Sequence, residues 1–311
     1  MREFLEVRED FLGRIIDAEG KDPTATCAQC ISPGVWRCVD CLGRPLYCRT
    51  HCQESHSKLI SHRIQRWTGR FFLDCQIWEV GVKLYLGHAG APCPVYESSN
   101  VHLEAQLDCM PYMQPSTSSY FATGGMAEPD VEPDVLPEDE LADDTPSGPI
   151  PFHKSVPQED DIGNPFILVV DSRQAFHLPA MPCGCAGAEN ILQYLDLAMF
   201  PASYINVRTV FTFRCLDDFR LSNLECKTSA YQYFQKIHRS TNPAFPHAVP
   251  NRYSELLRVS RQWRNLKLRK WFKFGHRLGI VPQRGEMALF CAACPQINVN
   301  LPDDWKIRYT Q

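Results

Sequence analysis

The chain has 311 residues, of which 44% are hydrophobic, and its formal net charge is −4. This length accommodates two domains, and the composition is that of an ordinary globular protein. No uninterrupted apolar run approaches the roughly 20 residues that span a bilayer, so we expect no membrane partner.

An amphipathic helix is predicted near the start of the chain. Within residues 4–18, Phe4, Val7, Phe11 and Ile15 recur at steps of three and four residues, and Gly20 follows. We expect this helix to cover the module that comes next. The charged start, MREFLEVRED, contains no apolar signal core, so we also expect an intracellular chain with reduced thiols.

Nine thiols and imidazoles lie between residues 27 and 62, beginning with two CxxC pairs. Their spacing is typical of zinc ligands, and nine candidates supply two tetrahedral ions with one to spare. Disulfides are the alternative, but they require an oxidising compartment. We expect a B-box/RING-like cross-brace: Cys27 and Cys30 pair with Cys48 and either His51 or Cys52, and Cys38 and Cys41 pair with His56 and His62. The choice between His51 and Cys52 stays open, since either residue type ligates zinc.

The segment after this cluster is rich in large aromatic residues, which predicts that it packs on the zinc module and completes a domain over residues 1–96. Its two cysteines, Cys75 and Cys93, have no CxxC partner and are interpreted as structural, with Cys93 a distant third choice as a ligand. Residues 97–161 are rich in Pro, Ser and acids, with nine acids and no base from Glu128 to Asp144. Such a composition favours a disordered linker, either a plain spacer or a segment that binds a basic surface.

A second domain is predicted over residues 162–311. The run PFILVVD is typical of a strand, and AFHLPAMPCGC can return beside it as a hairpin. Asp171 at the strand end is either a turn residue or, less commonly, a metal-binding carboxylate. Helical patterns dominate the remainder, at residues 187–200, 206–223, 227–241 and 251–274. We therefore expect an α+β protein: a small, zinc-stabilised module followed by a mainly helical domain with a short β-hairpin.

The last of these helices is strongly basic, with nine Lys or Arg and one acid from Arg252 to Arg277. One face carries apolar residues, and the opposite face carries bases that can neutralise phosphates. A solvated surface is the alternative, but the one-sided excess favours nucleic acid. The residues predicted to contact DNA are Arg258, Arg261, Arg269 and Lys273.

Two further thiol pairs flank the predicted helices. Together they make one complete tetrahedral set, so they predict a third zinc site; isolated buried cysteines are the alternative. The predicted ligands of this site are Cys183, Cys185, Cys291 and Cys294.

Several short motifs recur here in one order that resembles the region ahead of the catalytic domain in fungal KDZ transposases (Kyakuja, Dileera and Zisupton elements), including their CxC2-like cysteine cluster. The motifs are RWTGRFF, LGHAGAPCP, HLPAMPCGC, FPASYINVRTVFTF, RYSELLRVSRQWRNLK and GEMALFCAACPQINVNLPDDW. The resemblance implies transposase ancestry, bound zinc, and a DNA-related role in the nucleus. The ligands that the resemblance implies are Cys27, Cys30, Cys38, Cys41, Cys48, His56 and His62 in the first cluster and Cys183, Cys185, Cys291 and Cys294 in the second. Where the family usually shows a cysteine three residues after the one matching Cys48, this chain has His51, with Cys52 next.

In the family, the motifs matched by CAACP and NLPDDW are followed by an RNase H-like catalytic core, but this sequence stops at Gln311. We therefore expect no enzyme activity and no small-molecule substrate. The leading interpretation is a non-catalytic, zinc-binding and DNA-binding module of transposase origin. The alternative is a protein-interaction module of the B-box/RING type that does not bind DNA.

Overall fold

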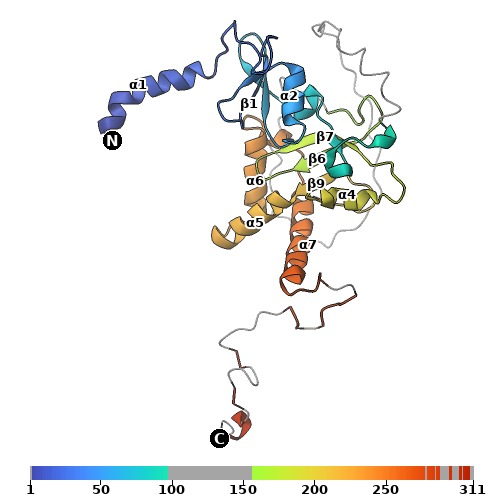
Figure 1. The fold of residues 1–311 in the computed structure, drawn as a ribbon. Helices are drawn as coiled ribbons and strands as arrows, with labels where there is room; N and C mark the ends of the chain where they lie inside the picture. Colours follow the sequence, from blue (N-terminus) through green and yellow to red (C-terminus); the bar gives the residue numbers. More distant parts are fainter. Residues whose placement is uncertain are drawn as a thin grey trace.

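The computed structural model describes residues 2–96, 156–276, 279–283, 285–287, 294–295, 301–302 and 304–308. A five-stranded mixed sheet separates an N-terminal layer from a helical layer (Figure 1). Strand β6 (Phe166–Val170) packs against both layers, because alternate residues of a strand point to opposite faces of the sheet. Ile167 and Val169 belong to the core shared with the N-terminal layer, while Leu168 and Val170 belong to the core shared with the helices. A strand buried on both faces needs an unbroken apolar sequence, which β6 has.

The strand order in this sheet is β5-β7-β6-β9-β8. Strands β6 and β7 form the predicted antiparallel hairpin, with Val170 opposite Ala175. Strand β9 runs parallel to β6, and β8 runs antiparallel to β9. The edge strand β5 comes from the N-terminal part of the chain and pairs in parallel with β7, with Leu84 opposite Ala180. The other strands are β5 (Leu84–Tyr85), β7 (Ala175–Met181), β8 (Met199–Pro201) and β9 (Thr209–Thr212).

The N-terminal layer is built on a second, antiparallel sheet with the order β2-β1-β3-β4. Its strands are short, so they supply little core of their own, and the thiols of the first cysteine cluster contribute to the buried centre. The elements of this layer are β1 (Trp36–Cys38), β2 (Leu46–Tyr47), α2 (Arg49–His56), β3 (Ile64–Trp67), β4 (Phe72–Cys75), and the 3₁₀ turns η1 (Ile77–Val80) and η2 (His88–Gly90).

Three helices cover the other face of the central sheet: α5 (Phe213–Glu225), α6 (Ala230–Thr241) and α7 (Tyr253–Trp271). The first turns of α5 and α6 are capped by side chains: the hydroxyl of Thr212 accepts the N–H of Cys215, and Ser229 forms a capping box with Gln232. The remaining short elements are α4 (Asn190–Asp196), η4 (Pro246–Ala248) and α8 (Trp305–Arg308). Across the described part of the chain, no helix combines the length and apolar character that a bilayer crossing needs.

Two of the four predicted helical segments, residues 227–241 and 251–274, contain the helices α6 and α7. The other two are helical only in part: 206–223 begins with strand β9, and 187–200 ends with strand β8. Tertiary contacts override the helical pattern here, because β9 pairs with β6 in the sheet and β8 pairs with β9 at its edge. The fold is therefore mixed α/β, and the second part of the chain is less helical than the sequence predicts.

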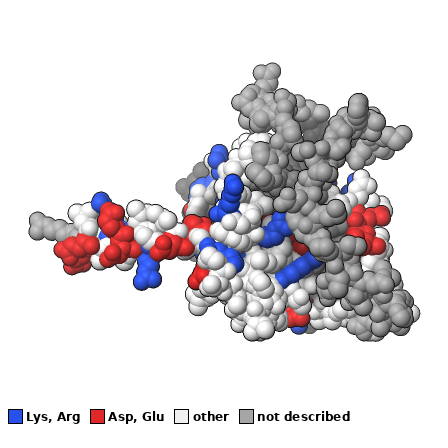
Figure 2. Space-filling model, turned by 90° about the horizontal axis from the view of Figure 1, so that it is seen from above, with Lys and Arg blue, Asp and Glu red and all other residues white. Residues whose placement is uncertain are grey.

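The N-terminal helix α1 (Arg2–Asp17) forms where predicted, but the expectation that it covers the zinc module is wrong. It projects from the body of the protein, and acidic, basic and uncharged side chains all lie on its surface (Figure 2). Phe4, Phe11 and Ile15 are 48%, 55% and 63% exposed. Only the turn after the helix is anchored, because the Arg37 guanidinium donates to the carbonyl of Ala18.

The predicted division at residues 97 and 161 stays a prediction, and most of the expected linker, residues 97–155, lies outside the described residues. The two flanking regions nevertheless share one sheet through β5 and β7, and one apolar core that includes Leu86 and Phe176. Folding of either region therefore depends on surface that the other region supplies.

Candidate metal centres

The first Cys/His set lies where the 27–30 turn meets the start of α2. It contains Cys27, Cys30, Cys48 and His51, whose ligand atoms all lie within 4.8 Å of one another. Cys48 is the N-cap of α2, so His51 follows one helical turn later and places its Nδ1 atom 3.3 Å from the Cys48 Sγ atom. Burial opposes ionisation of Cys27, but the backbone N–H groups of Cys48 and Gln29 outweigh it and lower the pKa of the Cys27 thiol to about 6.

The second set joins strand β1 to the end of α2 and contains Cys38, Cys41, His56 and His62. The Nε2 atom of His56 lies 3.5 Å from Cys41 Sγ, and the Nδ1 atom of His62 lies 3.4 Å from Cys38 Sγ. The other nitrogen of His56, Nδ1, lies 2.8 Å from the backbone carbonyl of Cys52. A carbonyl in that position favours the tautomer with hydrogen on Nδ1 and a free lone pair on Nε2, as a metal ligand requires.

Cys52 thus takes part through its backbone rather than its thiol. Its side chain is fully buried, and burial raises the pKa of the Cys52 thiol to about 12. The structure brings His51, and not the Cys52 thiol, into the first set. Along the sequence the two sets alternate, since Cys38 and Cys41 lie between the two halves of the first set.

A third set combines residues from the two sides of the 97–155 segment: His88, Cys93, Cys183 and Cys185. Strands β5 and β7 run in parallel, so the chain segments that leave their carboxyl ends emerge at the same edge of the sheet. The His88 Nε2 atom lies 3.2 Å from Cys183 Sγ and 3.4 Å from Cys185 Sγ. The Cys93 Sγ atom lies 3.7 Å and 3.8 Å from the same two sulfurs.

A glycine permits this close approach. Gly87 has a φ of +79°, and a Cβ atom added there would lie 2.9 Å from the Cβ of Cys183. A side chain at this position is thus excluded both by backbone conformation and by space.

The separations within the sets match a tetrahedral zinc ion. Zn–S bonds of about 2.3 Å and Zn–N bonds of about 2.0–2.1 Å give tetrahedral edges of about 3.8 Å between two sulfurs and about 3.6 Å between sulfur and nitrogen. Cys30 and Cys48 are 3.9 Å apart, and the sulfur to nitrogen distances quoted above run from 3.2 to 3.5 Å. The side chains present therefore fit a metal ion at each of the three sets.

The third set differs from the predicted one at two of its four positions. Cys183 and Cys185 belong to it, but their companions are His88 and Cys93. Cys291 lies outside the described residues, and the exposed Cys294 is not part of any of the three sets. The sequence favours a structural role for Cys93 because it has no CxxC partner. The signal for this half-site is the HxxxxC spacing from His88 to Cys93, which is weak until the parallel pairing of β5 and β7 is known.

Asp171 has a structural role in this arrangement. Its carboxylate is 1% exposed and accepts hydrogen bonds from Arg214 Nε at 3.1 Å and from Thr212 Oγ1 at 2.7 Å. The Arg214 Nη2 atom bridges Asp171 and the hydroxyl of Ser61, which is the neighbour of His62. The pair therefore ties the central sheet to the loop of the second Cys/His set.

The basic helix α7 buries Leu256, Val259 and Trp263 against the core, as the apolar pattern predicts. Of the residues predicted to contact DNA, Arg261 is exposed, Arg269 is half-buried and Lys273 follows the last residue of the helix. Arg258 is also exposed, but its Nη2 atom donates to the carbonyl of Ala202 at 2.8 Å. Within the described parts of the chain, Arg261, Arg269 and Lys273 form no ion pair with an acid, in contrast to Lys267, which pairs with Asp217. Their charges are therefore available to a partner.

The chain was compared with curated proteins, solved structures and protein families, and one family match was found. Neither a curated protein nor a solved structure was found to match this chain. A family model does match, over 92 of the 311 residues, and this stretch contains Cys183 and Cys185 of the third set. The resemblance to KDZ-associated sequences is thereby confirmed for residues 153–244, which match the family described as "CxC2 like cysteine cluster associated with KDZ transposases".

Proposed function

We propose that this chain is a non-catalytic, nuclear module of a KDZ-type transposase that binds three zinc ions and uses the basic face of α7 to bind DNA. The observation that carries the zinc assignment is the presence of three Cys/His sets with tetrahedral spacing. Thiolate and imidazole are the ligands that zinc prefers, and four of them make a closed, structural site without an open position for chemistry. The alternating order of the first two sets supports a cross-brace.

Zinc would add stability where the fold has little core. The strands of the N-terminal layer are two to four residues long, and its buried centre includes Cys27, Cys38 and Cys52. Burial raises the pKa of the Cys38 thiol to about 12, but a coordinated thiol is deprotonated by the charge of the metal. Metal binding and folding of this layer are thus one coupled process.

The DNA assignment is supported by the unpaired bases of α7. Arg261, Arg269 and Lys273 lack acidic partners among the described residues, and the helix that carries most of them is fixed to the core by Leu256 and Trp263. Bases on a helix that is fixed to the core can neutralise the phosphates of a DNA backbone. Because phosphate contacts position a protein without reading bases, we expect this surface to bind with little sequence preference.

The test is DNA affinity across a salt series for the full, zinc-loaded chain and for the triple variant Arg261→Gln, Arg269→Gln, Lys273→Gln. The slope of log affinity against log salt is expected to fall by about 0.9 for each phosphate that the variant no longer neutralises. Arg258 is left intact because its bond to Ala202 makes its removal a test of stability as well.

A matched control removes the same number of charges from the N-terminal layer: Arg49→Gln, Lys58→Gln, Arg70→Gln, all exposed positions. If both triple variants change the slope equally, the effect is one of net charge and the α7 surface is not the DNA site. An unchanged slope in the α7 variant would remove the DNA assignment altogether.

A protein-interaction module is the second candidate, and one observation favours it. Helix α1 exposes seven large apolar side chains, a surface that proteins commonly bury against a partner. In a pull-down from nuclear extract, protein capture that survives nuclease treatment and disappears when α1 is deleted would support this candidate. Capture that nuclease abolishes would favour the DNA module.

A further inference from the structure

Helix α7 ends in an exposed aromatic ring. All six tryptophans of the chain lie among the described residues, and the other five are buried or half-buried. Trp271, the last residue of α7, is 60% exposed, although tryptophan is highly buried on average. Figure 1 shows this end of the helix on the side of the body opposite the N-terminal layer, so the ring lies away from the first two Cys/His sets.

Contacts between α5 and α7 hold the ring from one side. The Cζ atom of Arg220 lies 5.5 Å from the centroid of the Trp271 ring, within the range of a cation–π contact. One helical turn before Arg220, the Asp217 carboxylate accepts from Trp263 Nε1 and Lys267 Nζ of α7, at 2.9 Å each. These contacts fix the end of α7 against α5, and more than half of Trp271 remains open to solvent.

Basic residues flank the ring. The sequence Arg269–Lys273 reads Arg-Lys-Trp-Phe-Lys, with three bases and no acid in five residues. Lys270 and Lys273 are exposed and form no ion pair with an acid within the described parts of the chain, whereas Lys267 pairs with Asp217. Bases at a helix C-terminus commonly serve only to offset the negative end of the helix dipole. These charges therefore do not make a site by themselves, and the open ring between them is the second feature.

The turn that ends α7 holds Lys273 in an unusual conformation. The N–H of Phe274 bonds the carbonyl of Arg269 at 2.9 Å, and the N–H of Lys273 bonds the carbonyl of Lys270 at 3.1 Å, which are the two bonds of a Schellman motif. Lys273 has a φ of +66° and occupies the position where this motif usually has glycine. A lysine where glycine would be less strained indicates that its side chain has a use beyond ending the helix.

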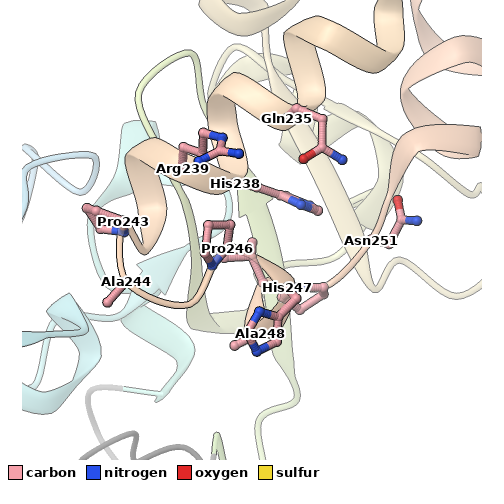
Figure 3. Close-up of a pocket in the computed structure, with 11 residues that line it drawn as sticks. Gln235, His238, Arg239, Pro243, Ala244, Pro246, His247, Ala248 and Asn251 are labelled. Carbon is pink, nitrogen blue, oxygen red and sulfur yellow. The ribbon is translucent and has the colours of Figure 1, made fainter. Parts of the chain in front are cut away.

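The cavity near the other end of α7 does not suit an anionic chain. It has a volume of about 720 Å³ and lies between α6 and the segment that leads into α7 (Figure 3). Burial lowers the pKa of His238 in its wall, so the ring is neutral and donates to the carbonyl of Pro250. Its Nε2 atom is therefore a buried acceptor, without a partner among the described residues, and an acceptor repels phosphate oxygens. The ring and bases at the C-terminal end of α7 are better suited to nucleic acid.

We propose that Trp271 stacks on an unpaired base of single-stranded DNA while Lys270 and Lys273 neutralise the phosphates beside it. In a duplex only the edges of the bases are accessible, in the grooves, so a ring that stacks on a base selects an unpaired strand. Stacking together with positive charge holds single strands with little sequence preference. The inference rests on the proposed DNA function and adds to it a site for the unpaired strand at the end of α7.

The experiment measures binding of the full, zinc-loaded chain to a labelled oligothymidylate and to a duplex of the same length by fluorescence anisotropy. Trp271→Ala is expected to weaken oligothymidylate binding at least about fivefold, the lower end of the loss when a stacking ring is removed, and to leave duplex binding unchanged. Trp271→Phe is expected to retain most of the affinity, because it keeps a ring face. Tyr204→Ala is the matched control: Tyr204 is 59% exposed, between β8 and β9, and its removal is expected to change neither affinity.

A second probe separates stacking from charge. An oligonucleotide of the same length with abasic sites in place of its bases keeps every phosphate, so Trp271→Ala is expected to bind it as the wild type does. The proposal is overturned if the wild type does not bind oligothymidylate, if Trp271→Ala binds it as the wild type does, or if this substitution weakens binding of all three probes equally.

The outcome is independent of the salt series on duplex DNA, which tests the proposed function. An effect of Trp271→Ala on the single strand, together with an unchanged duplex slope in the triple variant of Arg261, Arg269 and Lys273, would remove the duplex surface and retain the single-strand site. A lowered slope in that triple variant, with no effect of Trp271→Ala on the single strand, would retain the proposed function and overturn this inference.

Discussion

The Nε2 atom of His88 lies 3.2 Å from the Sγ atom of Cys183, although 95 residues separate the two in sequence. This approach closes the third Cys/His set, and it stands at the end of the parallel pair that β5 forms with β7. A zinc ion at this point would hold the N-terminal layer and the central sheet together. With a metal ion bound, the third set would be a clasp between two regions that the sequence presents as separate domains.

The ligand set of this clasp can be tested by single substitutions. The variant Cys93→Ser is expected to bind one zinc ion fewer per chain than the wild type, because a serine hydroxyl is a poor replacement for thiolate at a zinc site. Metal content after exhaustive dialysis, measured by mass spectrometry, checks this. Cys226→Ser is the control, since Cys226 is an exposed thiol outside all three sets.

The competing ligand set makes the opposite prediction for Cys294→Ser. If Cys294 completed the site with Cys183 and Cys185, its removal would release an ion, and Cys93→Ser would leave the content unchanged. That pair of results would contradict the geometry described above.

A glycine substitution tests the same clasp without touching a ligand. Gly87→Ala is expected to lower affinity for the third zinc ion at least about tenfold, because strain of about 1–3 kcal/mol adds to a clash with Cys183. Gly187→Ala is a close control: its φ is +78°, but an added Cβ meets nothing within 4 Å. Competition with a chelator of known affinity measures the zinc affinity of both variants. An equal decrease in zinc affinity in the two variants would show that the clash with Cys183 has no effect.

Removal of the Asp171 carboxylate tests the link between the central sheet and the loop of the second Cys/His set. Asp171→Ala is expected to lower the free energy of unfolding by about 3 kcal/mol, near the lower end for breaking a buried ion pair, because Arg214 is half exposed. Denaturant unfolding of the zinc-loaded protein measures this. Asp196→Ala, at an exposed position, is the control. If Asp171→Ala lowers the free energy of unfolding no more than Asp196→Ala does, the Asp171–Arg214 pair adds no stability.

Cleavage between the two regions tests whether they form one unit. A protease site inserted within residues 97–155 would allow the chain to be cut after folding. The two pieces are expected to stay together on size-exclusion chromatography, because they share the β5 and β7 pairing and the core around Leu86 and Phe176. Separation of the pieces while zinc is bound would show that the shared core is too weak to hold them.

The sequence was most informative where the signal was local. The CxxC pairs and the block from Cys48 to His62 lie within one short stretch, and the structure brings together the two predicted sets, with His51 rather than Cys52 as the fourth member of the first. The PFILVVD run likewise marked the central strand, because its apolar character reflects burial on both faces.

The parts that escaped prediction depend on contacts distant in sequence. His88 and Cys93 become companions of Cys183 only when β5 joins the sheet beside β7, and two residues of strand give no readable pattern. The segment that became β9 carried a helical pattern, but the place beside β6 decided its conformation. For α1, amphipathic spacing predicted the helix correctly and said nothing about what its apolar face contacts.

The most direct test of this account is the number of zinc ions bound per full chain, measured by native mass spectrometry with the protein purified under reducing conditions. Three ions are predicted, and their removal by a chelator is expected to abolish the folded signal of the N-terminal layer, since its buried centre is built around the ligand thiols. Two ions or fewer in protein that is fully reduced and folded would contradict the account, because one of the three Cys/His sets would then hold no metal.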